Sequence, residues 1–178
     1  WAIVGGFNWG HQEEQDSIAA LQAAYDAGVT AFDTAEAYGD GYSEELVAKA
    51  LKGHLDEVVI ATKVSRGNLA PDQLRQSCEK SLQRLSRDCI DLYQLHWPNP
   101  AVPLEDTLAM MNTLKDEGKI REIGVSNFGI KSLQECCRLG IVPVSNQVAY
   151  NLLFRVVENE IMPFCRQHGI SILCYSPI

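Results

Sequence analysis

The sequence has few basic residues and no cluster of them. Its 15 Lys and Arg are outnumbered by 23 Asp and Glu, so the formal net charge is -8 at pH 7. Proteins that bind nucleic acid or anionic membranes neutralise phosphate groups with clustered Lys and Arg. The composition therefore argues against both kinds of partner.

The sequence also lacks long apolar runs and closely paired cysteines. No run approaches the ~18 apolar residues of a membrane-spanning helix, and the first residues, WAIVGGF, have no basic lead or cleavage site of a signal peptide. The six cysteines lie within apolar segments and show no C-x-x-C spacing: Cys78, Cys89, Cys136, Cys137, Cys165 and Cys174. We interpret them as reduced residues of a cytoplasmic protein.

What the sequence does contain is a repeated alternation of two patterns. Apolar, β-branched runs, typical of strands, lie at residues 28–35, 57–64, 89–97, 121–128, 144–150 and 171–177. Their nearly continuous apolarity favours parallel strands that are covered on both faces. Helical periodicity marks the segments between them, and four glycines follow such segments where a left-handed helix cap is expected: Gly28, Gly118, Gly140 and Gly169.

The length of the repeat predicts the architecture. Corresponding strand ends at Asp33, Lys63 and His96 are 30 and 33 residues apart, the length of one strand-plus-helix unit. Such units build either an open doubly wound sheet or a closed (β/α)8 barrel. Polar residues end nearly every strand, whereas an open sheet would gather them at one switch point, so we favour the barrel. We expect residues 1–178 to form a single domain.

The first strand ends carry ionisable side chains. Burying Asp33, Lys63 or His96 alone is costly, but the strand ends of a barrel converge on one pocket, where the charges compensate each other. Tyr38 follows Asp33 by five residues and can lean over the same pocket as a general acid. We expect the Lys63 ammonium to lower the pKa of Tyr38, with Asp33 orienting the lysine and His96 donating to a substrate carbonyl oxygen.

The later strand ends carry neutral side chains. Ser126, Asn127 and Gln147 can donate to and accept from an amide, and Tyr175 offers an aromatic face beside them. An amide-bearing ring that can stack, such as nicotinamide, suits this set. Simple capping of the next helix is an alternative for Ser126 and Asn127.

Two other kinds of site are excluded by what these segments lack. The stretch GDGYSEE has no third glycine of a G-x-G-x-x-G motif and no acidic ribose ligand downstream, so it is not a Rossmann fingerprint. A metal site in a barrel needs several His and carboxylate ligands at the strand ends, whereas the later ends carry Ser, Asn, Gln and Tyr. We expect no metal site.

Several segments together resemble the aldo-keto reductase superfamily in order and spacing across essentially the whole chain. They are GVTAFDTAEAYGDGYSEELVAKAL, VVIATKV, DLYQLHWPNP, IREIGVSNF, VSNQVAYNLLFR and CYSPI. The resemblance implies an NADPH-dependent carbonyl reductase on a (β/α)8 barrel, with NADH not excluded as cofactor. It also implies that Tyr38 donates the proton, that Lys63 and Asp33 tune it, and that His96 orients the carbonyl of a small-molecule substrate.

The resemblance assigns the remaining residues as well. It implies that Ser126, Asn127 and Gln147 hold the carboxamide of the cofactor, and that Tyr175 stacks on the nicotinamide. Asp33 and Ser176 complete the expected cofactor contacts. In the same way Trp1 and Trp97 are expected to line the substrate pocket together with Tyr38 and His96.

Complete members of that family continue beyond the segment that matches CYSPI. We therefore expect an incomplete barrel, with the first strand truncated and the eighth strand and C-terminal loop absent. Two other functions stay open at this point. A desolvated lysine at a barrel strand end suits a Schiff-base aldolase that uses Lys63 as nucleophile. A barrel that retains its cofactor site without efficient turnover suits a non-enzymatic, cofactor-sensing regulatory subunit.

Overall fold

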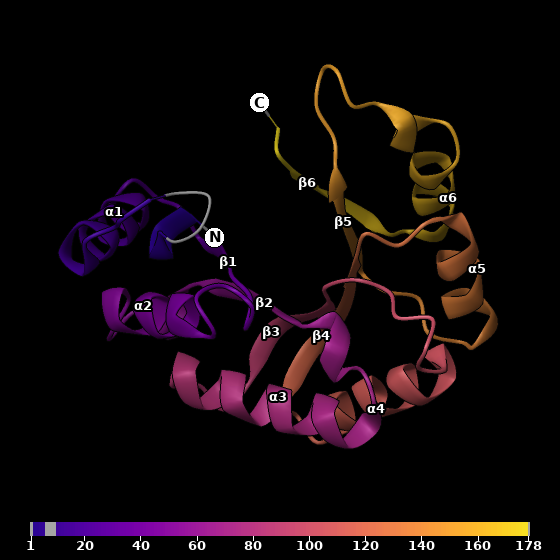
Figure 1. The fold of residues 1–178 in the computed structure, drawn as a ribbon, viewed down its shortest axis with the longest axis horizontal. Coiled ribbons are helices and arrows are strands. Elements are labelled where there is room, and N and C mark those ends of the chain that lie inside the picture. Colours follow the sequence, from indigo (N-terminus) through magenta and orange to yellow (C-terminus); the bar gives the residue numbers. More distant parts are fainter. Residues whose placement is uncertain (1, 6–9, 178) are drawn as a thin grey trace.

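The computed structural model describes residues 2–5 and 10–177, which form a curled parallel sheet with helices along its outer side (Figure 1). The strands are β1 (Ala31–Asp33), β2 (Val59–Val64), β3 (Ile90–Leu95), β4 (Ile120–Ser126), β5 (Ser145–Ala149) and β6 (Ser171–Tyr175). The helices are α1 (Glu14–Asp26), α2 (Tyr42–Ala50), α3 (Pro71–Leu85), α4 (Leu104–Asp116), α5 (Ile130–Arg138) and α6 (Ile161–His168). All six expected strands are confirmed.

The strand order distinguishes the two architectures. The strands pair in the order β1-β2-β3-β4-β5-β6, and every pair is parallel. A doubly wound sheet reverses its strand order at a switch point, and this sheet has no reversal. Figure 1 shows the helices following one another in an arc around the sheet, from α1 in indigo to α6 in yellow. The fold is therefore that of a (β/α)8 barrel in part, with β1 and β6 as the edges of the described sheet.

The helix ends follow the local sequence. All four glycines expected at helix ends have positive φ, between +71° and +89°. A residue with a side chain rarely adopts this left-handed conformation, so the glycines end the helices without strain. At the other end of a helix, Pro71 begins α3, where its missing N–H has no partner to lose.

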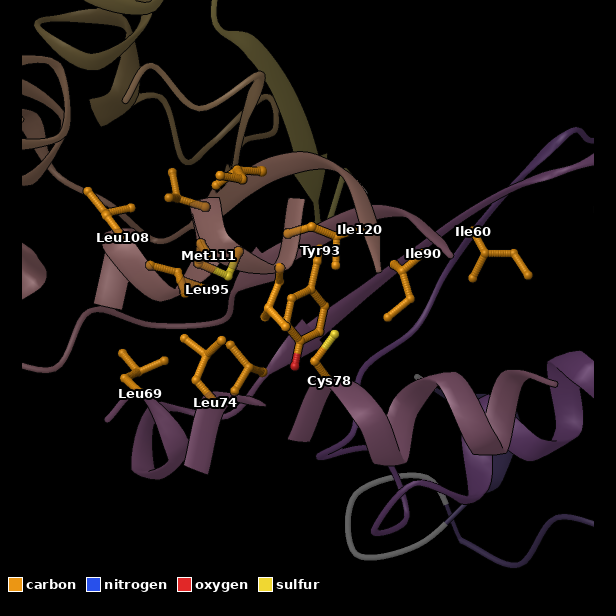
Figure 2. Packing of buried hydrophobic residues seen from close by; sticks show 14 of the residues in the cluster. Ile60, Leu69, Leu74, Cys78, Ile90, Tyr93, Leu95, Leu108, Met111 and Ile120 are labelled. Atoms are coloured by element: carbon orange, nitrogen blue, oxygen red, sulfur yellow. The ribbon is translucent and has the colours of Figure 1, made fainter. Parts of the chain in front are cut away.

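The core lies between the outer face of the sheet and the helices. Tyr93 and Leu95 of β3 are fully buried there, against Leu74 and Cys78 of α3 and Met111 of α4. Figure 2 shows this packing, with the Tyr93 ring beside Cys78. Burying side chains of this size stabilises each by about 1.5–3 kcal/mol relative to exposure, so the core anchors β3 at the centre of the sheet.

Side chains alternate between the two faces of each strand, and this alternation places the polar groups. On β2, Thr62 points outward and donates to Glu44 of α2, whereas its neighbour Lys63 lies on the inner face and bonds to Asp33 of β1. On β4, Gly124 leaves room on the inner face, since a Cβ there would lie 2.7 Å from Ser145 Oγ. The inner face therefore accommodates polar side chains near the strand ends.

The N-terminal segment differs from expectation. Ala2–Val4 form a 3-10 helix and not the end of a strand. The Ile3 carbonyl accepts a hydrogen bond from Ser17 Oγ of α1 at 2.6 Å, so the segment is held by a helix rather than by a neighbouring strand. Trp1, which was expected to line the substrate pocket, lies outside the described residues.

Three expectations about composition can be compared with the structure. All six cysteines are free thiols, as expected. Within the described ranges, no helix is both long and apolar enough to cross a membrane. In the same ranges no three His, Cys, Asp or Glu residues gather in a group that could hold a metal ion.

Candidate functional site

One cavity at the carboxyl ends of the strands collects the expected site residues. Its volume is about 570 Å³, and it is lined by Asp33, Ala37, Tyr38, His96, Trp97, Ser126, Asn127, Gln147, Cys174, Tyr175 and Ser176. Among the described residues, all those expected from the sequence line it except Lys63, which is buried against Asp33. The register of parallel strands explains the convergence, because equivalent ends of neighbouring strands meet at one edge of the sheet.

Lys63 and Asp33 form the buried base of the cavity. The Lys63 side chain is 0% exposed, and its Nζ donates to Asp33 Oδ2 at 2.5 Å and to the Thr34 carbonyl at 2.8 Å. The Asp33 side chain is 41% exposed and therefore reaches from this pair into the cavity. The carboxylate compensates the charge of a lysine that has no contact with solvent.

Tyr38 and His96 lie next to the Lys63–Asp33 pair. Their rings meet edge to face, with centroids 5.7 Å apart and an interplanar angle of 82°. Lys63 Nζ lies 5.1 Å from the centre of the Tyr38 ring. A phenol, an imidazole and an ammonium thus lie together at one wall of the cavity.

The prediction that the Tyr38 pKa is lowered is wrong for the chain without bound ligands. Burial, together with the smaller effect of the Asp33 carboxylate, raises the pKa of Tyr38 to about 12. Desolvation of the phenolate and the negative charge of Asp33 outweigh the stabilisation that the Lys63 ammonium gives to the phenolate. Tyr38 is therefore fully protonated at neutral pH.

Burial also shifts the pKa values of His96 and Lys63. It lowers the pKa of His96 to about 4, with the Lys63 ammonium adding to the effect, so the imidazole is neutral at pH 7. It lowers the pKa of Lys63 as well, while the Asp33 carboxylate opposes that shift. A neutral imidazole can donate one N–H to a carbonyl oxygen without adding a charge to the cavity.

The neutral residues line the same cavity and bond to one another. Asn127 donates from Nδ2 to the His96 carbonyl at 3.1 Å and to Ser126 Oγ at 3.0 Å, and its Oδ1 accepts from the Tyr175 hydroxyl at 2.8 Å. Ser126 Oγ donates to the Gln147 carbonyl at 3.0 Å. None of these bonds caps α5, whose N-cap is Gly129 without a side-chain bond. The capping alternative is therefore excluded, and the bonds orient hydroxyl and amide groups along one wall.

Two buried side chains that were not expected from the sequence lie behind the residues that line the cavity. Gln94 of β3 is fully buried and donates from Nε2 to Asp33 Oδ1 at 3.3 Å. Glu44 of α2 is also fully buried, one layer behind Lys63. A signal for Gln94 exists, since it interrupts the apolar run DLYQLHW two residues before His96.

Comparison with known proteins places the chain in a family. The model of the aldo/keto reductase family matches residues 3–178. The chain is 42% identical to aldo-keto reductase YhdN of Bacillus subtilis over 191 residues, with 100% of the chain and 56% of that protein covered. It is 37% identical to the NADH-specific methylglyoxal reductase of Escherichia coli over 201 residues, with 100% of the chain and 61% of that protein covered. The chain belongs to the aldo/keto reductase family.

A solved structure agrees with this assignment. The aldo/keto reductase of Klebsiella pneumoniae in complex with NADP and acetate superposes with a TM-score of 0.86 at 39% identity, covering 91% of this chain and 58% of that one. The chain thus spans less than two thirds of the length of each of these relatives.

Proposed function

We propose that the chain carries the catalytic residues of an NADPH-dependent reductase that converts an aldehyde or ketone to an alcohol, with NADH as a possible substitute. The observation that carries the proposal is that Tyr38, His96 and Asp33 line a single cavity, with Lys63 buried against Asp33 and near the Tyr38 ring. Short 2-oxoaldehydes are the first substrates to test, because one similar protein is a methylglyoxal reductase.

The donor set of the cavity fits a nicotinamide. Ser126, Asn127 and Gln147 present hydroxyl and amide groups on one wall, and the Tyr175 ring is held beside them by its bond to Asn127. When bound, reduced nicotinamide supplies the hydride that adds to the carbonyl carbon. Gln147 donates to Asp33 Oδ1 at 3.0 Å, so binding a carboxamide through its amide requires this internal bond to be exchanged.

The proton comes from the protein. Addition of hydride leaves an alkoxide, which is a far stronger base than a phenolate, so Tyr38 can donate its proton even with a pKa of about 12. The neutral His96 imidazole donates a hydrogen bond to the same oxygen and fixes its position. The Lys63 ammonium, 5.1 Å from the ring centre, stabilises the phenolate as it forms.

Replacement of Tyr38 by Phe tests this role. We expect kcat to fall about 100-fold or more, because the hydroxyl is needed only when the proton moves, while the Kd for NADPH stays within about twofold. Steady-state kinetics with methylglyoxal and fluorescence titration with NADPH measure the two quantities. Tyr42→Phe is the matched control, since Tyr42 lies four residues away and bonds to Glu14 of α1. Retention of turnover within about threefold in Tyr38→Phe contradicts the assignment.

Lys63 argues against the aldolase alternative. Its side chain is 0% exposed and its Nζ is bonded to Asp33 and to the Thr34 carbonyl, so no substrate carbonyl reaches it without disrupting the pair. The turnover rate distinguishes the regulatory alternative from the reductase. Tight NADPH binding with no reduction of any carbonyl in a broad panel would favour a cofactor sensor.

A further inference from the structure

A buried carboxylate outside the site takes part in no step described so far. Glu44, in the first turn of α2, is 0% exposed, and both of its oxygens are bonded. Arg84 of α3 donates from Nε to Oε2 at 2.6 Å, and Thr62 of β2 donates from Oγ1 to Oε1 at 2.5 Å. These three residues, the Arg84–Glu44–Thr62 cluster, join two helices to the strand that carries Lys63.

Arg84 reaches Glu44 because residue 41 has no side chain. Gly41 has a φ of +92°, and a Cβ at this position would lie 2.5 Å from Arg84 Nε and 2.8 Å from its Cζ. Gly41 follows Tyr38 by three residues, in the turn that leads into α2. The segment that carries the proton donor therefore passes directly against the guanidinium group.

A chain of hydrogen bonds continues from this turn to the site. The Ser43 N–H donates to the Tyr38 carbonyl at 3.1 Å, and Ser43 Oγ accepts from Thr34 Oγ1 at 2.7 Å. Lys63 Nζ in turn donates to the Thr34 carbonyl at 2.8 Å. The backbone of Tyr38 and the ammonium of Lys63 are thus linked through residues adjacent to Glu44.

Glu44 also acts on Lys63 electrostatically. Burial lowers the pKa of Lys63, and the carboxylates of Asp33 and Glu44 oppose that shift. The charged and titratable groups around Lys63 are Asp33 of β1, Tyr38 and His96 at the strand ends, Glu44 of α2, and Arg84 of α3 behind Glu44. Asp33 and Glu44 are the two carboxylates among these groups.

We propose that the Arg84–Glu44–Thr62 cluster is a positioning device for proton transfer. It fixes the Tyr38 segment against β2, and it holds a second carboxylate, besides that of Asp33, against the strand that carries the Lys63 ammonium. The inference rests on the proposed function for its catalytic consequence. Its electrostatic part concerns the chain alone and can be measured without substrate.

The test compares two neighbouring carboxylates on the same helix. Glu44→Gln removes the buried charge and keeps the shape of the side chain, whereas Glu45→Gln removes an exposed one. We expect Glu44→Gln to lower kcat roughly tenfold and to move the alkaline limb of the pH–kcat profile to lower pH, because Lys63 loses its proton more easily. Glu45→Gln should match the parent in both respects. Equal profiles for the two variants would overturn the proposal.

A second variant separates this effect from loss of folding. Glu44→Gln leaves the Arg84 guanidinium without its carboxylate and can unfold the chain. Glu44→Met/Arg84→Met replaces the whole pair with apolar side chains, which is often neutral for stability. We expect this double variant to fold, with near-parent circular dichroism, and to have a kcat about tenfold below the parent. Its alkaline limb should shift less than that of Glu44→Gln, because the Arg84 charge is removed together with that of Glu44. A folded double variant with the kcat of the parent would also overturn the proposal.

A direct titration distinguishes this inference from the proposed function. The Nζ signal of Lys63 in protein labelled with 15N-lysine is identified by its absence in Lys63→Met and is followed against pH without cofactor. We expect its midpoint to fall in Glu44→Gln and to be unchanged in Glu45→Gln. If the midpoint falls while the parent reduces no carbonyl, the electrostatic role of Glu44 stands and the proposed function fails. If turnover is present and the midpoint is unchanged, the proposal about Glu44 fails alone.

Discussion

His96 shows how a single residue is set for its role by its surroundings. Its ring lies against Tyr38, and burial together with the Lys63 ammonium lowers its pKa to about 4. The positive form of the ring is therefore the unfavourable one. An uncharged donor that stays uncharged across the neutral pH range keeps the electrostatics of the cavity constant while the substrate binds.

This shift predicts a pH dependence of stability. An unfolded histidine binds a proton below pH ~6.5, whereas folded His96 does so only below pH ~4, so the unfolded state binds more protons between these values. The free energy of unfolding should therefore fall as the pH falls through this window. Urea denaturation at pH 7 and pH 4.5 measures the loss, and the loss should be smaller in His96→Asn. A titration midpoint near 6.5 for the His96 ring in an NMR experiment would contradict the prediction.

Some residues of the site could be predicted and others could not, for a physical reason. Asp33, Lys63 and His96 are polar groups at the ends of apolar runs, and that contrast is visible in the sequence. Glu44 and Glu45 are identical neighbours, yet one is fully buried and the other exposed. The difference depends on Arg84, which lies 40 residues away along the chain.

The Tyr38 pKa illustrates the same point. The sequence places an ammonium near the phenol, and the structure brings Lys63 Nζ to 5.1 Å from its ring centre. The direction of the pKa shift nevertheless depends on how deeply the ring is buried and on how Asp33 divides its charge between its neighbours. Both quantities arise only when the segments pack together.

At the scale of the elements, β4 contributes a residue without a side chain to the inner face of the sheet. Gly124 faces Gln94 of β3 and Ser145 of β5 in the sheet register. A Cβ at position 124 would lie 2.7 Å from Ser145 Oγ and 2.9 Å from Gln94 Cγ. The glycine therefore leaves the space in which the Gln94 side chain extends to Asp33.

We expect Gly124→Ala to lower the free energy of unfolding by about 1–3 kcal/mol, because the added methyl group overpacks the inner face. Ser145→Ala in the same chain should recover part of this loss, since it removes the atom that the new Cβ meets first. Urea denaturation of the two single variants and the double variant measures the coupling. Gly67→Ala, at a position where a Cβ would meet nothing within 4 Å, is the control. Equal losses for Gly124→Ala and Gly67→Ala would show that packing at β4 is not the cause.

The strands were predictable because their signal is local. Each apolar run expected from the sequence overlaps one observed strand, although β1 is only three residues long where a run of eight was expected. The turn before it and the loop after it are apolar for other reasons, since Ala35 is packed into the core. Ala2–Val4 show that an apolar segment does not always form a strand. These residues form a 3-10 helix that is bonded to α1.

At the scale of the whole molecule, the loop after β5 exposes apolar side chains. Leu152 and Leu153 are 88% and 95% exposed, and Phe154 is 51% exposed. The described sheet also has two edges, β1 and β6, each paired on one side. Exposed apolar side chains and open strand edges both promote association between chains.

We expect a polypeptide of only these 178 residues to self-associate at micromolar concentration, as measured by sedimentation velocity. Leu153→Asp should reduce the association without changing the free energy of unfolding, because this side chain has almost no buried surface to lose. Gln134→Asp adds the same charge at an exposed position of α5 and is the control. The same degree of association in both variants would exclude the loop as the contact surface.

The sequential order of the strands has a consequence for synthesis on the ribosome. In the described sheet each strand pairs with the next one along the chain, as Phe32 does with Ile60 and Gln94 with Gly124, so these pairings need no distant segment. Each new unit can dock on the one before it as it leaves the exit tunnel. The contact of Lys63 with Asp33 needs only the first two strands. The acid–base half of the cavity can therefore assemble while the ribosome is still translating the codons for Ser126, Gln147 and Tyr175.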